Sequence, residues 1–190
     1  MKTIDAAKKY LSHDPEAKAT FDAMDEAVTT RDPDRLHELS KHFSAYVRRG
    51  VAFNPNTRHY TLHELRNDPD KEVRIGIARK QNTRHDTLHD MRNDQYSCVR
   101  YNVARHTNTR PDTLHDMRND PDFLVKEKIA KHPNTRHDTL HDMRNDRHPD
   151  VREAVAKHPN TRHDTLHDMR NDIEDYVREA VAERLRELSY

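Results

Sequence analysis

Hydrophobic residues along the chain fall into short stripes with helical spacing. In residues 151–159 (VREAVAKHP), Val151, Val155 and Ala156 lie at positions i, i+4 and i+5, on one narrow face of a helix. Pro159 follows and is expected to end the helix, because the residue before a proline avoids the helical conformation. The pattern therefore predicts a short amphipathic helix with a polar outer surface.

A second pattern is carried by the sequence HDTLHDMRND, in which Leu88 and Met91 lie three residues apart and share a helix face. Thr83, followed three residues later by Asp86, resembles a capping box with aspartate in place of the usual glutamate. This spacing predicts a helix that begins at Arg84, with Leu88 and Met91 pointing inward and the histidine and aspartate side chains facing water.

The two patterns alternate with a period of 26 residues. The triplet Asn-Thr-Arg marks this step, and it begins at Asn56, Asn82, Asn108, Asn134 and Asn160. The sequence LHEL at 36–39 recurs at 62–65, so a degenerate first copy begins near Thr30, and six copies fill residues 30 to about 186. Tandem copies of this length are typical of solenoids, in which each unit packs against its neighbours.

One copy buries too few apolar side chains to offset the conformational entropy that its residues lose on folding. Neighbouring copies bury these stripes when they stack. The prediction is an all-α chain, an α-solenoid of six two-helix repeats with helical caps.

Both ends of the repeat array differ from its middle. Residues 1–29 are expected to form an N-terminal cap of two amphipathic helices, and residues 30–190 the solenoid. The apolar positions of the cap are Ala6, Ala7, Tyr10, Leu11, Phe21, Met24 and Val28. The last copy replaces Lys-His-Pro with Glu183-Arg184-Leu185, which predicts a longer, outwardly charged capping helix at the other end.

Residues 151–161 (VREAVAKHPNT) and 67–78 (NDPDKEVRIGIA) resemble the bacterial leucine-rich repeat variant family, whose units carry the pattern D-P-D-x-x-V-R-x-x-V-A-x-x-P-N-T. The resemblance covers roughly residues 30–186, and the family is related in style to HEAT-like repeats. It implies a right-handed superhelix that alternates α-helices with shorter, sometimes 3₁₀, helices. The founding type of the family carries a cysteine-rich iron–sulfur segment, and with Cys98 as the one cysteine here no such cofactor is expected.

Composition narrows the class of function. Only 32% of the residues are hydrophobic and 36% are charged, which suits an array better than one central core. Lys plus Arg equals Asp plus Glu at 34 each, so no net charge attracts nucleic acid or membrane. The single cysteine, and a first segment without the apolar stretch of a signal peptide, favour a cytoplasmic protein that does not enter membranes.

Histidine pairs at i, i+4 are the first candidate for chemistry, and they are His59 and His63, His85 and His89, His137 and His141, and His163 and His167. Two imidazoles at this spacing suit a divalent metal, but a closed site needs further ligands and the next helix lies about 8–10 Å away. The pairs are therefore interpreted as polar surface columns, and no metal or other cofactor is predicted. Because histidine titrates near pH 6.5, the 16 histidines predict sensitivity to mild acid.

An arginine follows the valine that opens each second helix, at Arg48, Arg74, Arg100, Arg152 and Arg178, with Lys126 in the odd copy. Such a ladder could follow phosphates. An aspartate precedes each position by six residues in copies two to six, at Asp68, Asp94, Asp120, Asp146 and Asp172, and these pairs favour a structural role. A further basic column at the ends of the second helices contains Arg79, Lys80, Arg105, Lys131 and Lys157, with His106, His132 and His158. Either these cations interact favourably with the negative ends of the helix dipoles, or the column binds an anionic ligand.

The copies differ most in their second halves, where Tyr96, Tyr101, Phe123, Leu124 and Tyr176 appear. Aromatic residues are enriched at binding hot spots, and packing between repeats is the alternative explanation. The chain has no glycine-rich phosphate loop and no nucleophile elbow, so no catalytic residue is predicted.

The sequence thus favours a non-catalytic scaffold that binds another protein, with a nucleic-acid-binding module as the alternative. Its oligomeric state stays open. The candidate partner-binding residues are Tyr96, Tyr101, Tyr176, Arg79, Arg105, Lys131 and Lys157.

Overall fold

The computed structural model describes residues 14–189, and this part of the chain contains helices and turns but no β-strand. The chain divides into two compact units, Met1–Thr87 and Leu88–Tyr190, and each is described by itself. The predicted all-α fold is confirmed for the described residues. Ala6, Ala7, Tyr10 and Leu11 of the predicted cap lie outside them.

In the first unit the helices are α2 (Pro15–Thr29), α3 (Pro33–Leu39), α4 (Ala45–Phe53), α5 (His59–Glu64), the 3₁₀ helix η1 (Leu65–Asn67) and α6 (Lys71–Arg79). Helix α7 (His85–Asp90) runs across the boundary between the units. The second unit contains η2 (Met91–Asn93), α8 (Ser97–Arg105), α9 (Pro111–Asp116), α10 (Phe123–Lys131), α11 (His137–Met143), α12 (Pro149–Lys157), α13 (His163–Asp168) and α14 (Asp175–Glu187).

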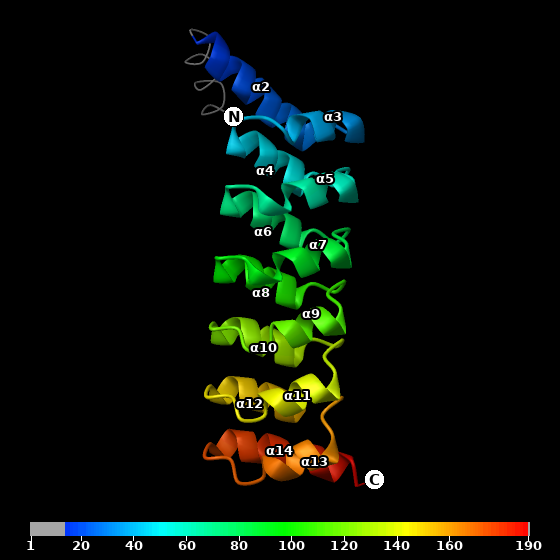
Figure 1. The fold of residues 1–190 in the computed structure, drawn as a ribbon, viewed down its shortest axis with the longest axis vertical. Coiled ribbons are helices and arrows are strands. Elements are labelled where there is room, and N and C mark those ends of the chain that lie inside the picture. The colour runs from blue at the N-terminus through cyan, green and yellow to red at the C-terminus, as the bar shows by residue number, and fades with distance from the viewer. Residues whose placement is uncertain (1–13, 190) are drawn as a thin grey trace, which may run out of the picture. The chain divides into compact units, whose positions relative to one another are not determined.

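Both units are built as stacks of helix pairs. In the second unit α8 packs on α10, α10 on α12 and α12 on α14, and these helices lie above one another in Figure 1. The shorter helices α11 and α13 pack on α12 and α14, which follow them in the chain. In the first unit α2 packs on α4 and α4 on α6. Contacts between sequential helices are those of a solenoid, as predicted.

The hydrophobic stripes supply the interior of these stacks. Val151, Val155 and Ala156 are fully buried, and Leu88 and Met91 are at most 3% exposed, as their spacing predicts. The 3₁₀ helices η1 and η2 are of the kind that the resemblance implies.

Aspartate and proline define the helix starts. Asp122 accepts a hydrogen bond from the backbone N–H of Leu124 at 2.9 Å and caps α10, and Asp70 caps α6 in the same way. Pro111 and Pro149 occupy the first turns of α9 and α12, where no N–H is needed.

The predicted capping box is wrong. Helix α7 begins at His85, and Thr83 does not cap it but is fully buried, with its hydroxyl donating to the carbonyl of Ile77 at 2.7 Å. The last carbonyls of a helix lack intrahelical donors, so this threonine satisfies the end of α6 rather than the start of the next helix. Asp86 accepts from the backbone N–H of the following residue, Thr87, at 2.7 Å.

The two ends of the array differ in how far they match the prediction. In α2 the buried residue is Ala27, whereas Val28, predicted to face inward, is 64% exposed. Helix α14 has 13 residues against nine in α12, which confirms the longer final helix. Ala182 on α14 is exposed although the equivalent Ala156 on α12 is buried. Within residues 14–189 no helix is both long and apolar enough to cross a bilayer.

Candidate functional site

Three arginines of the ladder, Arg48, Arg100 and Arg152, form buried ion pairs between neighbouring copies, whereas Arg178 pairs with Asp175 on its own helix. Arg100 donates through Nε and Nη2 to the Asp120 carboxylate at 2.6 and 2.9 Å, and Arg152 binds Asp172 at 2.6 and 2.8 Å. Both arginine side chains are 11% exposed. The hydrogen bonds from Arg152 hold the pKa of Asp172 below its usual value.

The structural role of the ladder is therefore confirmed, but with a correction to its partners. The carboxylate comes from the next copy, 20 residues later, and not from the aspartate six residues earlier. That earlier aspartate contributes its backbone carbonyl, which accepts from Nη1 at 2.8 Å in both Arg100 and Arg152. Lys126 takes the arginine's place and pairs with Asp146. Guanidinium groups held in this way have few donors left for phosphate.

The second histidine of the first three pairs also links copies, which corrects the prediction that it faces only water, whereas His167 of the fourth pair is exposed. Nδ1 of His89 lies 3.0 Å from the hydroxyl of Thr113, and His141 makes the same contact with Thr165. In the first unit, His63 contacts Thr87 at 3.0 Å. Each threonine lies 24 residues after its histidine. No group of three or more His, Cys, Asp or Glu in residues 14–189 is arranged to hold a metal ion.

The histidines of the basic column are the largest departure from the prediction. His132 and His158 are each 4% exposed, so they are not surface cations. Nε2 of His158 lies 3.0 Å from the carbonyl of His132, while Nδ1 accepts from the backbone N–H of Asn160 at 3.0 Å. His132 makes the equivalent contacts with His106 and Asn134. This geometry requires the neutral ring, and burial lowers the pKa of both His132 and His158.

The same position in the first unit is filled by other donors with the same task. The side-chain amide of Asn54 donates to the carbonyl of Ala27 at 2.9 Å and its oxygen accepts from Asn56 N–H at 2.9 Å. Lys80 donates to the carbonyl of Asn54, and burial lowers the pKa of Lys80 to about 8. In each case the side chain donates a hydrogen bond to a backbone carbonyl at or next to the end of the preceding long helix in the stack, α2 or α4, whether or not the donor is charged.

The remaining members of the basic column are exposed. Lys131 and Lys157 pair with Glu127 and Glu153 one helical turn earlier, at 2.5 and 2.6 Å. Arg79 and Arg105 are exposed in the last turns of α6 and α8.

The aromatic candidates lie at the starts of the second helices. Tyr96 is 41% exposed and Tyr176 is 38% exposed, with its hydroxyl 3.3 Å from Asp150. Leu124 is 45% exposed. Tyr101 is half-buried, and the Lys128 ammonium lies 5.6 Å from its ring centroid.

A hollow of about 530 Å³ lies beside these residues in the second unit, where the starts of α8 and α10 meet the turn before α12. Phe123 and Leu124 line it, together with His148, whose ring stacks on Phe123 at 3.8 Å between centroids and 11° between planes. Each ring covers one face of the other, and the stacked pair lines the hollow. Sequence reasoning noted Phe123 but not His148, because their contact joins residues 25 positions apart.

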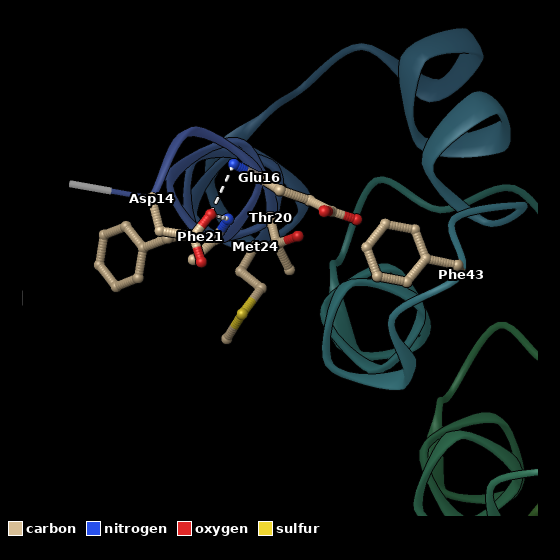
Figure 2. A pocket seen from close by; sticks show the side chains of 7 residues that line it. Asp14, Glu16, Thr20, Phe21, Met24 and Phe43 are labelled. Carbon is tan, nitrogen blue, oxygen red and sulfur yellow. Dashed lines mark hydrogen bonds between the residues drawn. The ribbon is translucent and has the colours of Figure 1, made fainter. Parts of the chain in front are cut away.

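Two further hollows are present, one in each unit. In the first unit, a hollow of about 420 Å³ is lined by α2 and Phe43, and Figure 2 shows the Phe43 ring facing Glu16 and Thr20 across it. Asp14 at its rim is engaged in capping α2, with bonds of 3.0 and 3.1 Å. In the second unit, His137, His141 and Asp164 line a hollow of about 200 Å³.

No protein-family model and no curated protein sequence matches the chain. Among solved structures it is similar to a leucine-rich repeat variant described as having a novel repetitive protein structural motif. The two share 24% sequence identity with a TM-score of 0.40, over 81% of this chain and 72% of that one. It is also similar to a designed armadillo repeat protein, with 10% identity and a TM-score of 0.35, over 92% of this chain and 94% of the other.

Proposed function

We propose that this protein is a non-catalytic, cytoplasmic scaffold that binds another protein through the starts of its second helices. One observation carries the proposal. Polar residues that recur along the array are engaged in contacts between copies, as in Arg100 with Asp120, Arg152 with Asp172 and His141 with Thr165, whereas residues that change from copy to copy, such as Tyr96 and Tyr176, are exposed. A constant framework with variable exposed side chains suits recognition of a partner.

The absence of a plausible reacting group supports a binding role over catalysis. Several of the histidines and arginines that recur have a structural partner in a neighbouring copy at hydrogen-bond distance, as His89, His141 and Arg152 do. The free thiol of Cys98 lies exposed at the start of α8, at a position that holds Leu124 in the next copy. We infer that neither ladder is organised for acid–base chemistry.

The alternative, a nucleic-acid-binding module, is less well supported by the contacts. A phosphate-binding surface needs several unpaired cations in a row. Lys131 and Lys157 are paired with glutamates, and His132 and His158 are buried and favour the neutral form. Weak binding to nucleic acid at low salt is the most that this column supports.

Capture from a lysate with two matched variants tests the proposal. The aromatic variant carries Tyr96→Asp and Tyr176→Asp, because other copies have aspartate at both positions and the fold accepts it. The basic variant carries Arg105→Ala and Lys157→Ala at the C-terminal ends of α8 and α12. We expect wild type and the basic variant to retain one protein, identified by mass spectrometry, in high salt, and the aromatic variant to lose it.

Two outcomes contradict the proposal. Retention of the same partner by the aromatic variant places recognition elsewhere. Binding of DNA or RNA that falls steeply with salt, and that the basic variant loses, favours the alternative, because phosphate contacts release counterions.

A further inference from the structure

The edge formed by the starts of the second helices can be assigned a ligand class, and this inference rests on the proposed function. The edge is defined as residues 95–98, 121–124, 147–150 and 173–176 of the second unit. Each segment contains the last turn residues and the first helical residues of α8, α10, α12 or α14. These helices pack in sequence, so the four segments lie side by side along the stack.

An aromatic surface with fixed orientation lies at the centre of this edge. His148 caps α12, since its Nδ1 accepts from the backbone N–H of Asp150 at 3.3 Å, and its ring face lies against Phe123. Both contacts hold the ring in place before any ligand arrives. Leu124 and Pro121 complete the apolar lining of the hollow, and Tyr96 and Tyr176 lie exposed on neighbouring segments. A rigid apolar surface binds a ligand with little loss of side-chain entropy.

The charge of the edge is negative. Its four carboxylates are Asp122, Asp150, Glu174 and Asp175, and its one guanidinium is Arg147. Asp175 is paired with Arg178 on the same helix, which leaves an excess of two negative charges when the histidine is neutral. A cationic ligand is therefore favoured and a phosphate backbone is disfavoured.

The distance between successive helices in the stack suits an extended ligand in which every third side chain points the same way. Packed helices lie about 8–10 Å apart. A polyproline II helix has three residues per turn and rises about 3.1 Å per residue, so every third side chain recurs after about 9.3 Å. Such a ligand presents one equivalent residue to each successive helix. A β-strand, with a side-chain period of two at about 3.3 Å, does not match this step.

We propose that the edge binds a proline-rich segment of another protein in the polyproline II conformation, with arginine or lysine at one end. Proline rings stack on the surface formed by Phe123 and His148 and on Tyr96. The basic end lies towards Asp150 and Glu174, beside Tyr176. Aromatic surfaces flanked by acidic groups are suited to this ligand because the polyproline II helix is already ordered before it binds.

Fluorescence anisotropy with two labelled peptides tests this assignment on the full chain. The probe has about nine prolines, or three turns of the helix, followed by a pair of arginines, and its control has alternating glycine and serine in place of proline. We expect the proline peptide to bind at least about fivefold more tightly than its control. Phe123→Ser, which copies Ser97 of another repeat, is expected to weaken the proline peptide roughly five- to tenfold. Tyr96→Asp, at an exposed capping position, should weaken it without affecting folding.

The outcomes separate this inference from the proposed function. Equal affinity for the two peptides, or unchanged affinity in both Phe123→Ser and Tyr96→Asp, overturns the ligand assignment. If the peptides bind equally but the Tyr96→Asp, Tyr176→Asp variant still loses its protein partner, the scaffold proposal stands and the ligand class is wrong. Selective binding of the proline peptide that Arg105→Ala leaves unchanged and Phe123→Ser weakens supports the assignment. Competition by single-stranded RNA at physiological salt overturns it in favour of a nucleic-acid ligand.

Discussion

Mild acid is expected to destabilise this protein through His132 and His158. In each ring Nδ1 accepts a hydrogen bond from a backbone N–H two residues later, at 3.1 and 3.0 Å, and Nε2 lies 3.0 Å from a carbonyl of the preceding copy. Protonation puts a hydrogen on Nδ1, directly opposite that N–H. Charge repulsion also disfavours the cation, from His106 and His158 at His132 and from Arg184 at His158.

The sign follows from proton linkage. The pKa of both rings is lowered in the folded protein, mainly by burial, from the ordinary 6.5. The unfolded chain therefore binds protons first as the pH falls. Stability is complete above pH 6.5, falls below it, and levels off once the folded rings are protonated too.

Two considerations limit how much free energy of unfolding the protein loses at pH 5. One pH unit corresponds to about 1.4 kcal/mol per group, so between pH 6.5 and pH 5 each histidine costs at most about 2 kcal/mol. Forced protonation would leave a buried backbone N–H unsatisfied, which costs about 1–3 kcal/mol. The two residues together are expected to lower the free energy of unfolding by about 2–4 kcal/mol at pH 5.

Urea unfolding followed by circular dichroism at pH 7.5, 6 and 5 measures this loss. The matched control is the double variant His132→Asn, His158→Asn, because Asn54 makes both hydrogen bonds at the equivalent position without titrating. We expect the variant to fold at pH 7.5 and to lose most of the dependence between pH 6.5 and 5. Titration of Asp86, Asp138 and Asp164 does not contribute to the change between pH 6.5 and 5, because their pKa values are lowered below 3.8.

Either of two results would refute this reasoning. Wild-type stability that is flat from pH 7.5 to pH 5 means that the buried rings accept protons without cost. An unchanged pH dependence in the asparagine variant assigns the effect to the other histidines.

Substitutions at three positions test the remaining contacts, each by urea unfolding at pH 7.5. Arg152→Ala is expected to cost about 3 kcal/mol because Asp172 loses its buried partner, whereas Arg152→Lys, the residue another copy carries, is expected to cost much less; equal losses would contradict the inference that a single cation suffices at this position. Thr135→Val removes the hydroxyl that donates at 2.5 Å to the last turn of α10 and should cost about 1–2 kcal/mol; a neutral result would mean that the carbonyl finds another donor. In Gly50→Ala the new Cβ would lie 2.9 Å from Cβ of Ala27, so overpacking of about 1–3 kcal/mol is expected to exceed the gain in helix propensity of about 1 kcal/mol. A higher free energy of unfolding for Gly50→Ala would show that α2 and α4 can move apart at little cost.

The candidate edge was only partly predictable from the sequence. Tyr96, Phe123 and Tyr176 were found because they interrupt a nearly constant repeat, a signal that needs no coordinates. The stack of Phe123 on His148 was not predictable, because periodicity aligns equivalent positions and these two residues are not equivalent. The same limit applies to His89 and Thr113, whose 24-residue separation falls short of the 26-residue step.

The sequence by itself determined the helical pairs, their step and their buried faces, because helical periodicity is a local property that stripes such as Val151 and Val155 record directly. Only the tertiary structure decided what the polar residues do. Thr83 was predicted to cap the helix that follows it and satisfies the one before it, and His132 and His158 were assigned to a basic column that could bind an anionic ligand but are buried. A polar side chain bonds to whichever unsatisfied group the neighbouring copy brings within about 3 Å, and spacing along the chain does not contain that distance.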